Sequence, residues 1–268
     1  MADSSISRNY GGVLAQTKIG WRSLVNTKLS HLRKDFLIKG TKHQKSARWQ
    51  TANMASESLP ALPNNYATAL QLIDEAHAQD PRKATPRSAA ADDTDVPFEL
   101  DYAQKMTRWL AKRCPDASPV LQLACRAQHF RRWEIPRSSY PMTRPGYLTW
   151  RAKLKAQAAT QVAELLSTSA SIQPPLPSEE VDRIAALIRK ENLAADPEAQ
   201  ALEDTACLVF LDDQFDDFER KPEIDEDKVV GILQKTWAKM SSPGRELALA
   251  MDLSDRTKAL IGKALASP

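Results

Sequence analysis

Glycine is scarce in this sequence, and its scarcity excludes several classes of protein. The chain has 8 Gly against 17 Pro in 268 residues. Gly-rich phosphate loops and many tight hairpins need residues that adopt positive φ, and neither GxGxxG nor GxxxxGKS/T occurs. No apolar run approaches the roughly 18 residues that a membrane-spanning helix requires. We therefore expect neither a Gly-rich nucleotide fold nor a membrane protein.

Cysteine is also rare, and its spacing argues against a disulfide framework or a zinc site. Cys114, Cys125 and Cys207 are odd in number and far apart, and no CxxC pair occurs. This usage is typical of reduced, mostly buried thiols in an intracellular protein. We therefore expect a cytoplasmic protein.

Acidic residues are nearly missing from the first part of the chain. Residues 1–60 hold 10 Lys and Arg against 3 Asp and Glu, whereas residues 61–268 hold 27 against 31. The body is mildly acidic, so the overall charge of +3 supports at most a local basic patch. We interpret 1–60 as a disordered basic leader or a mitochondrial transit segment. An extension upstream of a true start at Met54 is the remaining alternative.

Helical periodicity dominates the rest of the chain. Tyr102, Met106 and Leu110 share one helical face, and several predicted helices start with a cap residue followed by Pro, at Ser118, Asp196 and Ser242. We find no convincing alternating strand. The pattern predicts one all-α domain over 61–268, with a flexible linker at 80–97 and helices at about 65–79, 98–113, 118–133, 145–168, 178–192, 197–219, 226–240, 243–251 and 254–265.

The helix at 197–219 is predicted to be central, because its apolar residues occupy more than one face. Asp204 falls at the edge of that apolar surface. An unpaired buried carboxylate costs several kcal/mol, so we expect Asp204 to have a partner.

A segment rich in Arg and aromatic residues follows the predicted helix at 118–133. His129 shares a helical face with Leu121 and Cys125 and should point inward. Guanidinium groups and aromatic rings bind phosphates and bases, which predicts substrate binding by Arg132, Arg137, Arg144, Trp133 and Tyr140. Alternatively, the aromatic residues anchor the loop and the Arg residues pair with acids such as Asp204, Asp212 and Asp213.

Over about 65–266 the chain resembles the family called domain of unknown function 4202. The resemblance rests on Gln128-His129 with Arg132 to Arg137, Ser139-Tyr140-Pro141, Gly146-Tyr147 with Trp150-Arg151, Leu202 to Asp204 with Cys207 to Leu211, and Lys235 to Trp237 with Lys239 to Ser241. Members are sometimes labelled glutamyl-tRNA synthetase. Lys239-Met240-Ser241-Ser242 is similar to the synthetase loop that contacts ATP, but no HIGH motif is present. We expect a helix end and a Ser cap there, not synthetase activity.

The order of polar residues is also similar to that of the HD superfamily, all-α metal-dependent phosphohydrolases. This resemblance implies an HD-like bundle of about eight to nine helices in which Asp101, His129 and Asp204 bind one divalent metal ion. His129, Glu203 and Asp204 would be the catalytic residues, with Glu203 orienting a water. Phe130 stands where that family has an Asp ligand. The alternative is a bundle without metal, in which His129 bonds to Glu203 or Asp204.

Two functions follow as hypotheses. The first is a metal-dependent phosphohydrolase acting on a nucleotide or another phosphoester. The second is a non-catalytic module that binds a phosphate-bearing small molecule or an RNA end through the loop at 126–151. A third interpretation is a scaffold in which this loop only holds the bundle together.

Overall fold

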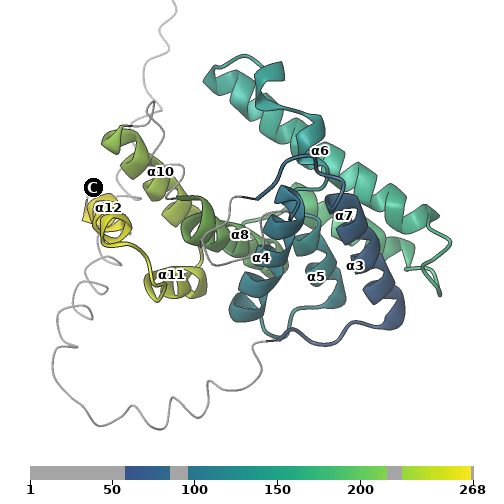
Figure 1. The fold of residues 1–268 in the computed structure, drawn as a ribbon. Coiled ribbons are helices and arrows are strands. Elements are labelled where there is room, and N and C mark those ends of the chain that lie inside the picture. The colour runs from purple at the N-terminus through teal and green to yellow at the C-terminus, as the bar shows by residue number, and fades with distance from the viewer. Residues whose placement is uncertain (1–57, 85–95, 216–224, 267–268) are drawn as a thin grey trace, which may run out of the picture. The chain divides into compact units, whose positions relative to one another are not determined.

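Helices form the fold in residues 58–84, 96–215 and 225–266, the part of the chain that the computed structural model describes. Within these ranges the only β pairing is an isolated bridge between Lys83 and Pro97. The prediction of an all-α protein is therefore confirmed, while the leader lies outside the described residues. The helices (Figure 1) are α3 (Asn64–His77), α4 (Phe98–Arg113), α5 (Pro119–Arg126), α6 (Arg144–Thr168), α7 (Ser178–Arg189), α8 (Pro197–Val209), α10 (Glu226–Lys239), α11 (Ser242–Leu249) and α12 (Asp255–Ala266).

Side-chain caps start the helices that the sequence marks with a cap residue and Pro. Ser118 accepts a hydrogen bond from the Leu121 amide, and Asp196 accepts from the amides of Glu198 and Ala199. A Pro in the first turn follows each of these caps, where its missing N–H is not needed. The predicted helix starts are confirmed within two residues in the described ranges.

The predicted helix at 118–133 is the main error. Helix α5 ends at Arg126, residues 127–130 form turns, and Arg131 has φ 49°. His129 therefore does not share a helix with Leu121 and Cys125. No Gly or Pro marks this end. Phe130, which is 2% exposed, packs in the first core from this turn, and such tertiary packing overrides helix propensity.

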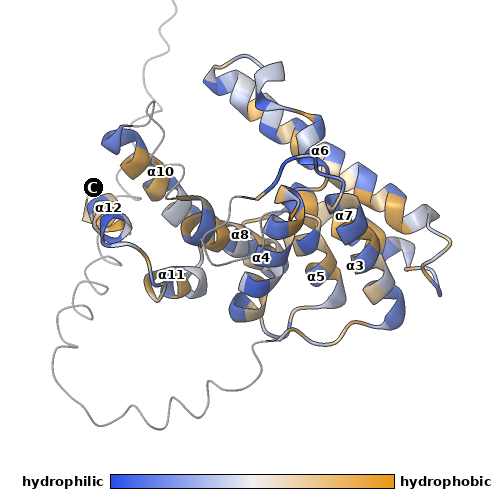
Figure 2. Cartoon of the chain, in the orientation of Figure 1, coloured by the Kyte–Doolittle hydropathy of each residue, from blue (hydrophilic) through white to orange (hydrophobic). Residues whose placement is uncertain are grey.

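Helix α8 lies between two hydrophobic cores, as predicted for the central helix. Leu202 and Val209 pack with α3 to α7, whereas Leu208 and Leu211 pack with α10 to α12. Residues from Phe210 to Gln214 continue α8 as a π-helix. Apolar and polar stripes run along most of the helices around it (Figure 2), as expected where each helix buries one face.

Both ends of the predicted linker at 80–97 are bonded to the rest of the chain. Asp80 is 2% exposed and accepts hydrogen bonds from Arg82 and from the Glu99 amide. The amides of Ala84 and Phe98 donate to Val96 and Arg82 across the bridge. Residues 85–95 lie outside the described ranges. No described helix is long and apolar enough to cross a membrane.

Candidate functional site

Asp204 is fully buried and accepts hydrogen bonds from three residues. Arg113 donates through Nε at 2.6 Å, and Gln200 donates through Nε2 at 3.0 Å. Ser241 donates twice, through its amide at 2.8 Å and through its hydroxyl at 2.5 Å. The expectation that this carboxylate has a partner is confirmed. Asp204 thereby links α8 to α4 and to the start of α11.

The segment at 239–242 is a helix end followed by a Ser cap, as predicted. Helix α10 ends at Lys239, and Ser241, not Ser242, caps α11 by accepting from the Gly244 amide at 3.3 Å. The Asp204 carboxylate lies at the N-terminus of α11, where negative charge is favourable. A Cβ atom at Gly244 would lie 2.7 Å from Asp204 Cγ. This end of α11 is therefore filled by the protein's own carboxylate.

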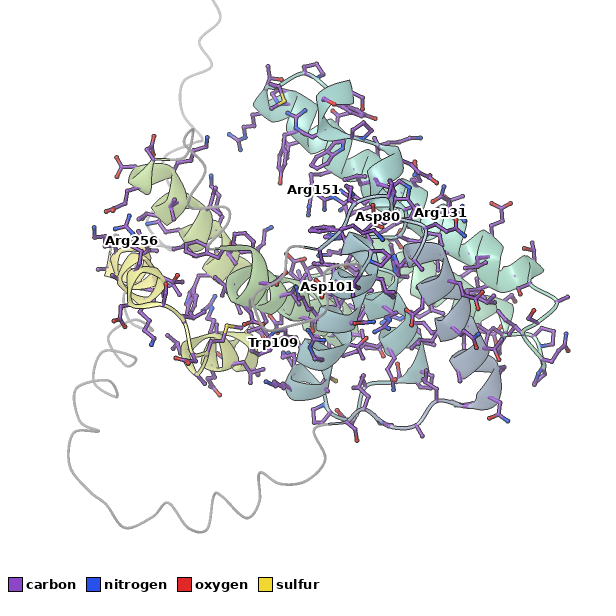
Figure 3. The ribbon with its side chains drawn as sticks, in the orientation of Figure 1. Asp80, Asp101, Trp109, Arg131, Arg151 and Arg256 are labelled. Atoms are coloured by element: carbon purple, nitrogen blue, oxygen red, sulfur yellow. The ribbon has the colours of Figure 1, made fainter. Side chains whose placement is uncertain are left out.

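Asp101, the second predicted metal ligand, lies in a different surrounding on α4. Its carboxylate accepts from Lys105 Nζ at 2.5 Å, and the same ammonium group also pairs with Asp213. One turn further along α4, Trp109 donates through Nε1 to Asp212 at 3.0 Å. Figure 3 shows Asp101 and Trp109 on this helix. These contacts join α4 to the π-helical segment after α8.

His129, the third predicted ligand, stacks on Tyr102 with ring centroids 4.0 Å apart. Its Nε2 atom lies 3.0 Å from Nη1 of Arg132. A guanidinium group only donates, so Nε2 accepts and the proton of a neutral imidazole is on Nδ1. Burial, followed by the charges of Arg132 and Arg151, holds the pKa of His129 well below its usual range. The alternative in which Glu203 or Asp204 is its partner is wrong.

The structure does not bring Asp101, His129 and Asp204 together as one ligand set. In the described ranges, no group of three or more His, Cys, Asp or Glu side chains is placed to hold a metal ion. Asp101 pairs with Lys105, and Asp204 pairs with Arg113. The acceptor nitrogen of His129 already accepts a hydrogen bond from Arg132. Metal binding therefore stays a prediction.

Glu203 belongs to what we call the basic cluster: Glu203 with Arg151, Lys155, Lys190 and Lys239, which interact with it electrostatically, and with Arg132, which interacts with Arg151. The Glu203 side chain is 7% exposed, pairs with Lys190 and lies 3.5 Å from Lys239 Nζ. Burial alone would raise the pKa of Glu203, but Lys190 and then Lys239 lower it below its usual range. Glu203 is therefore an ionised counter-ion within the cluster.

Lys190 reaches Glu203 from a strained position at the end of α7. Its φ of 60° and ψ of 45° are left-handed, a conformation that helix ends usually give to Gly. The Lys190 side chain is 12% exposed. Gly would adopt this left-handed backbone at a lower conformational free energy, but the position carries a cation that pairs with Glu203.

Two cations of the basic cluster come from α6. The side chains of Arg151 and Lys155 are half-buried and, among the described residues, neither side chain has a hydrogen-bond or ion-pair partner. Burial, followed by Lys190 and Arg151, lowers the pKa of Lys155. Burial and then Arg151 lower the pKa of Arg132 to about 10. Arg151 is labelled in Figure 3, where it lies on α6.

The predicted loop residues divide between loop anchors and solvent-facing groups. Arg137 donates to the carbonyls of Tyr140 and Pro141, and Arg132 lies 4.8 Å from the ring of Trp150. Trp150 is 7% exposed and donates to the Ile135 carbonyl, so an aromatic residue does anchor the loop. The other predicted binding residues are Trp133 and Tyr140, which are half-buried, and Arg144, which is exposed.

The predicted pairing of loop Arg residues with acids holds for Arg126, which pairs with Asp74 at 2.6 Å, but the partners named for the loop are not the ones that the structure shows. Asp204 pairs with Arg113 and Asp213 with Lys105, and neither cation belongs to the loop. Of the basic cluster, the sequence pointed to Arg132 and Glu203 as site residues and to Arg151 as part of the loop at 126–151, but not to Lys155, Lys190 or Lys239. The spacing of Arg151 and Lys155, four residues apart on one helix, was a detectable signal. Lys190 and Lys239 join the cluster only through tertiary packing.

Comparison with known proteins adds one finding. A family profile described as Domain of unknown function (DUF4202) matches residues 67–261. No curated protein and no solved structure matches the chain.

Proposed function

The chain belongs to the family described as Domain of unknown function (DUF4202), and for this member we propose that the basic cluster binds a phosphate-bearing ligand. The observation that carries the proposal is the excess of cations around Glu203. Arg151, Lys155, Lys190 and Lys239 interact electrostatically with this carboxylate, and Arg132 adjoins them through Arg151.

Burial makes this excess of positive charge costly. A partly desolvated cation is unfavourable unless it is paired. Burial and the neighbouring cations lower the pKa of Lys155, which shows this cost. Glu99, the carboxylate that also acts on Arg132, already binds Arg82. A bound anion would supply the missing negative charge, so the cluster is arranged for an anionic ligand.

The chemistry of the donors favours phosphate. The guanidinium groups of Arg132 and Arg151 present planar forks that match two phosphate oxygens, and the ammonium groups of Lys155 and Lys190 add point charges. In this proposal Glu203 keeps Lys190 and Lys239 in place when no ligand is bound.

Isothermal titration of the full chain with inorganic phosphate and pyrophosphate tests the proposal. Arg151→Ala and Lys155→Ala should each weaken binding about tenfold or more, because each removes a charge-assisted hydrogen bond worth about 1.5–3 kcal/mol. Lys153→Ala is the matched control, since Lys153 is an exposed cation on the same helix. Absence of binding, or equal weakening by all three variants, would contradict the proposal.

Metal-dependent phosphohydrolysis stays a separate prediction. Elemental analysis of the purified chain beside His129→Ala tests it, because near-stoichiometric metal that is lost in the variant would support His129 as a ligand.

A further inference from the structure

Three residues on one face of α6 combine an exposed ring with the cations of the basic cluster. Tyr147, Arg151 and Lys155 are spaced four residues apart, so they form a row along the helix with about 6 Å between neighbours. Trp150 and Leu154, which follow Tyr147 and Arg151 by three residues each, are buried, so the row lies along the edge of the buried face of α6.

Tyr147 is the exposed end of this row. Its side chain is 45% exposed, and it is one of the few large apolar residues in the described ranges that are open to solvent. Its ring lies 5.9 Å from the ring of Trp150, the residue that Arg132 covers from the loop. The phenol is also within electrostatic reach of Arg132. An aromatic surface therefore adjoins the proposed phosphate site.

We infer that the ligand is a nucleotide whose phosphate lies at Arg151 and Lys155 and whose base stacks on Tyr147. The inference rests on the proposed function, which supplies the phosphate site. In a nucleoside monophosphate the ribose separates base and phosphate by a distance comparable to one turn of α6. Base stacking on an aromatic side chain adds affinity without sequence readout, so the site should accept purine nucleotides in general. Because the row is short, a free nucleotide fits it better than a long polynucleotide.

Titration of the full chain with AMP, ribose 5-phosphate and inorganic phosphate tests the inference. AMP should bind roughly five- to hundredfold more tightly than ribose 5-phosphate, the range expected for one stacked base. Tyr147→Ala should remove this difference and leave ribose 5-phosphate binding unchanged, whereas Tyr147→Phe should keep it. Leu148→Ala is the matched control, since Leu148 is 57% exposed and lies off the row.

The outcomes separate the two proposals. If ribose 5-phosphate and phosphate bind but AMP binds no better, or Tyr147→Ala has no effect, the nucleotide inference is overturned while the phosphate site stands. If none of the three binds, the proposed function fails as well. If a 5′-phosphorylated tetranucleotide binds more than tenfold more tightly than AMP, the inference of a free nucleotide is overturned and an RNA end is the ligand.

Discussion

Asp204→Asn should strongly destabilise the protein, because the carboxylate neutralises a largely buried cation and orders the start of α11. The substitution keeps the shape of the side chain but removes its charge, which leaves Arg113, only 15% exposed, without its ion-pair partner. Breaking a buried ion pair in this way costs about 3–5 kcal/mol. At about 2–4 °C per kcal/mol for a domain of this size, the melting temperature should fall by about 6–20 °C.

Thermal unfolding of the full chain, followed by circular dichroism in the presence of a chelator, measures this effect. Asp252→Asn is the control, because the Asp252 side chain is fully exposed and lies 3.9 Å from Lys258. The control should change the melting temperature by less than about 2 °C. If Asp204→Asn behaves like the control, or destabilises the protein only when metal is added, the assignment of Asp204 as a structural anchor is refuted.

Three further predictions concern other parts of the molecule. Gly244→Ala should destabilise by about 1–3 kcal/mol through its contact with Asp204, whereas Gly231→Ala, with nothing within 4 Å, should stabilise α10 by roughly 0.5–1 kcal/mol in denaturant titrations. Burial and nearby cations keep the pKa of His129 well below 6.5, so below pH 6.5 the unfolded chain takes up a proton that the folded chain does not. Stability should then decrease by up to about 1.4 kcal/mol per pH unit, and a His129→Gln variant should flatten this dependence. Burial, followed by Glu203, raises the pKa of Cys207 to about 12, so iodoacetamide at pH 8 should label it only after unfolding.

Much of the helix pattern could be predicted from local chemistry. The limits of α4 agree with the predicted helix at 98–113, and the caps at Ser118 and Asp196 form the predicted hydrogen bonds. Caps and periodicity are properties of neighbouring residues, so the sequence shows them directly. The expectation of buried thiols is confirmed for Cys125 and Cys207.

The candidate site could be predicted only in part, because its members meet through tertiary packing. His129 was placed inward on a continuous helix, but it reaches Tyr102 from a turn after that helix has ended. That Asp204 needs a partner follows from its burial. That this partner is Arg113 depends on how α4 packs on α8. Lys190 occupies a helix end where a local rule would place Gly, so no sequence pattern pointed to it.

Because α8 is shared by two cores, the helices that pack on one side of it can open locally while the other core stays intact. The helices α10 to α12 are held to α8 by the second core and by the bonds between Ser241 and Asp204. If α10 to α12 move away from α8 together, Lys239 separates from Glu203 and the basic cluster loses the cation that α10 supplies. Local opening of this kind is measured by amide hydrogen exchange. A ligand held by both Lys239 and α6 would close this opening, and its binding would appear as slower exchange in α10 and α11.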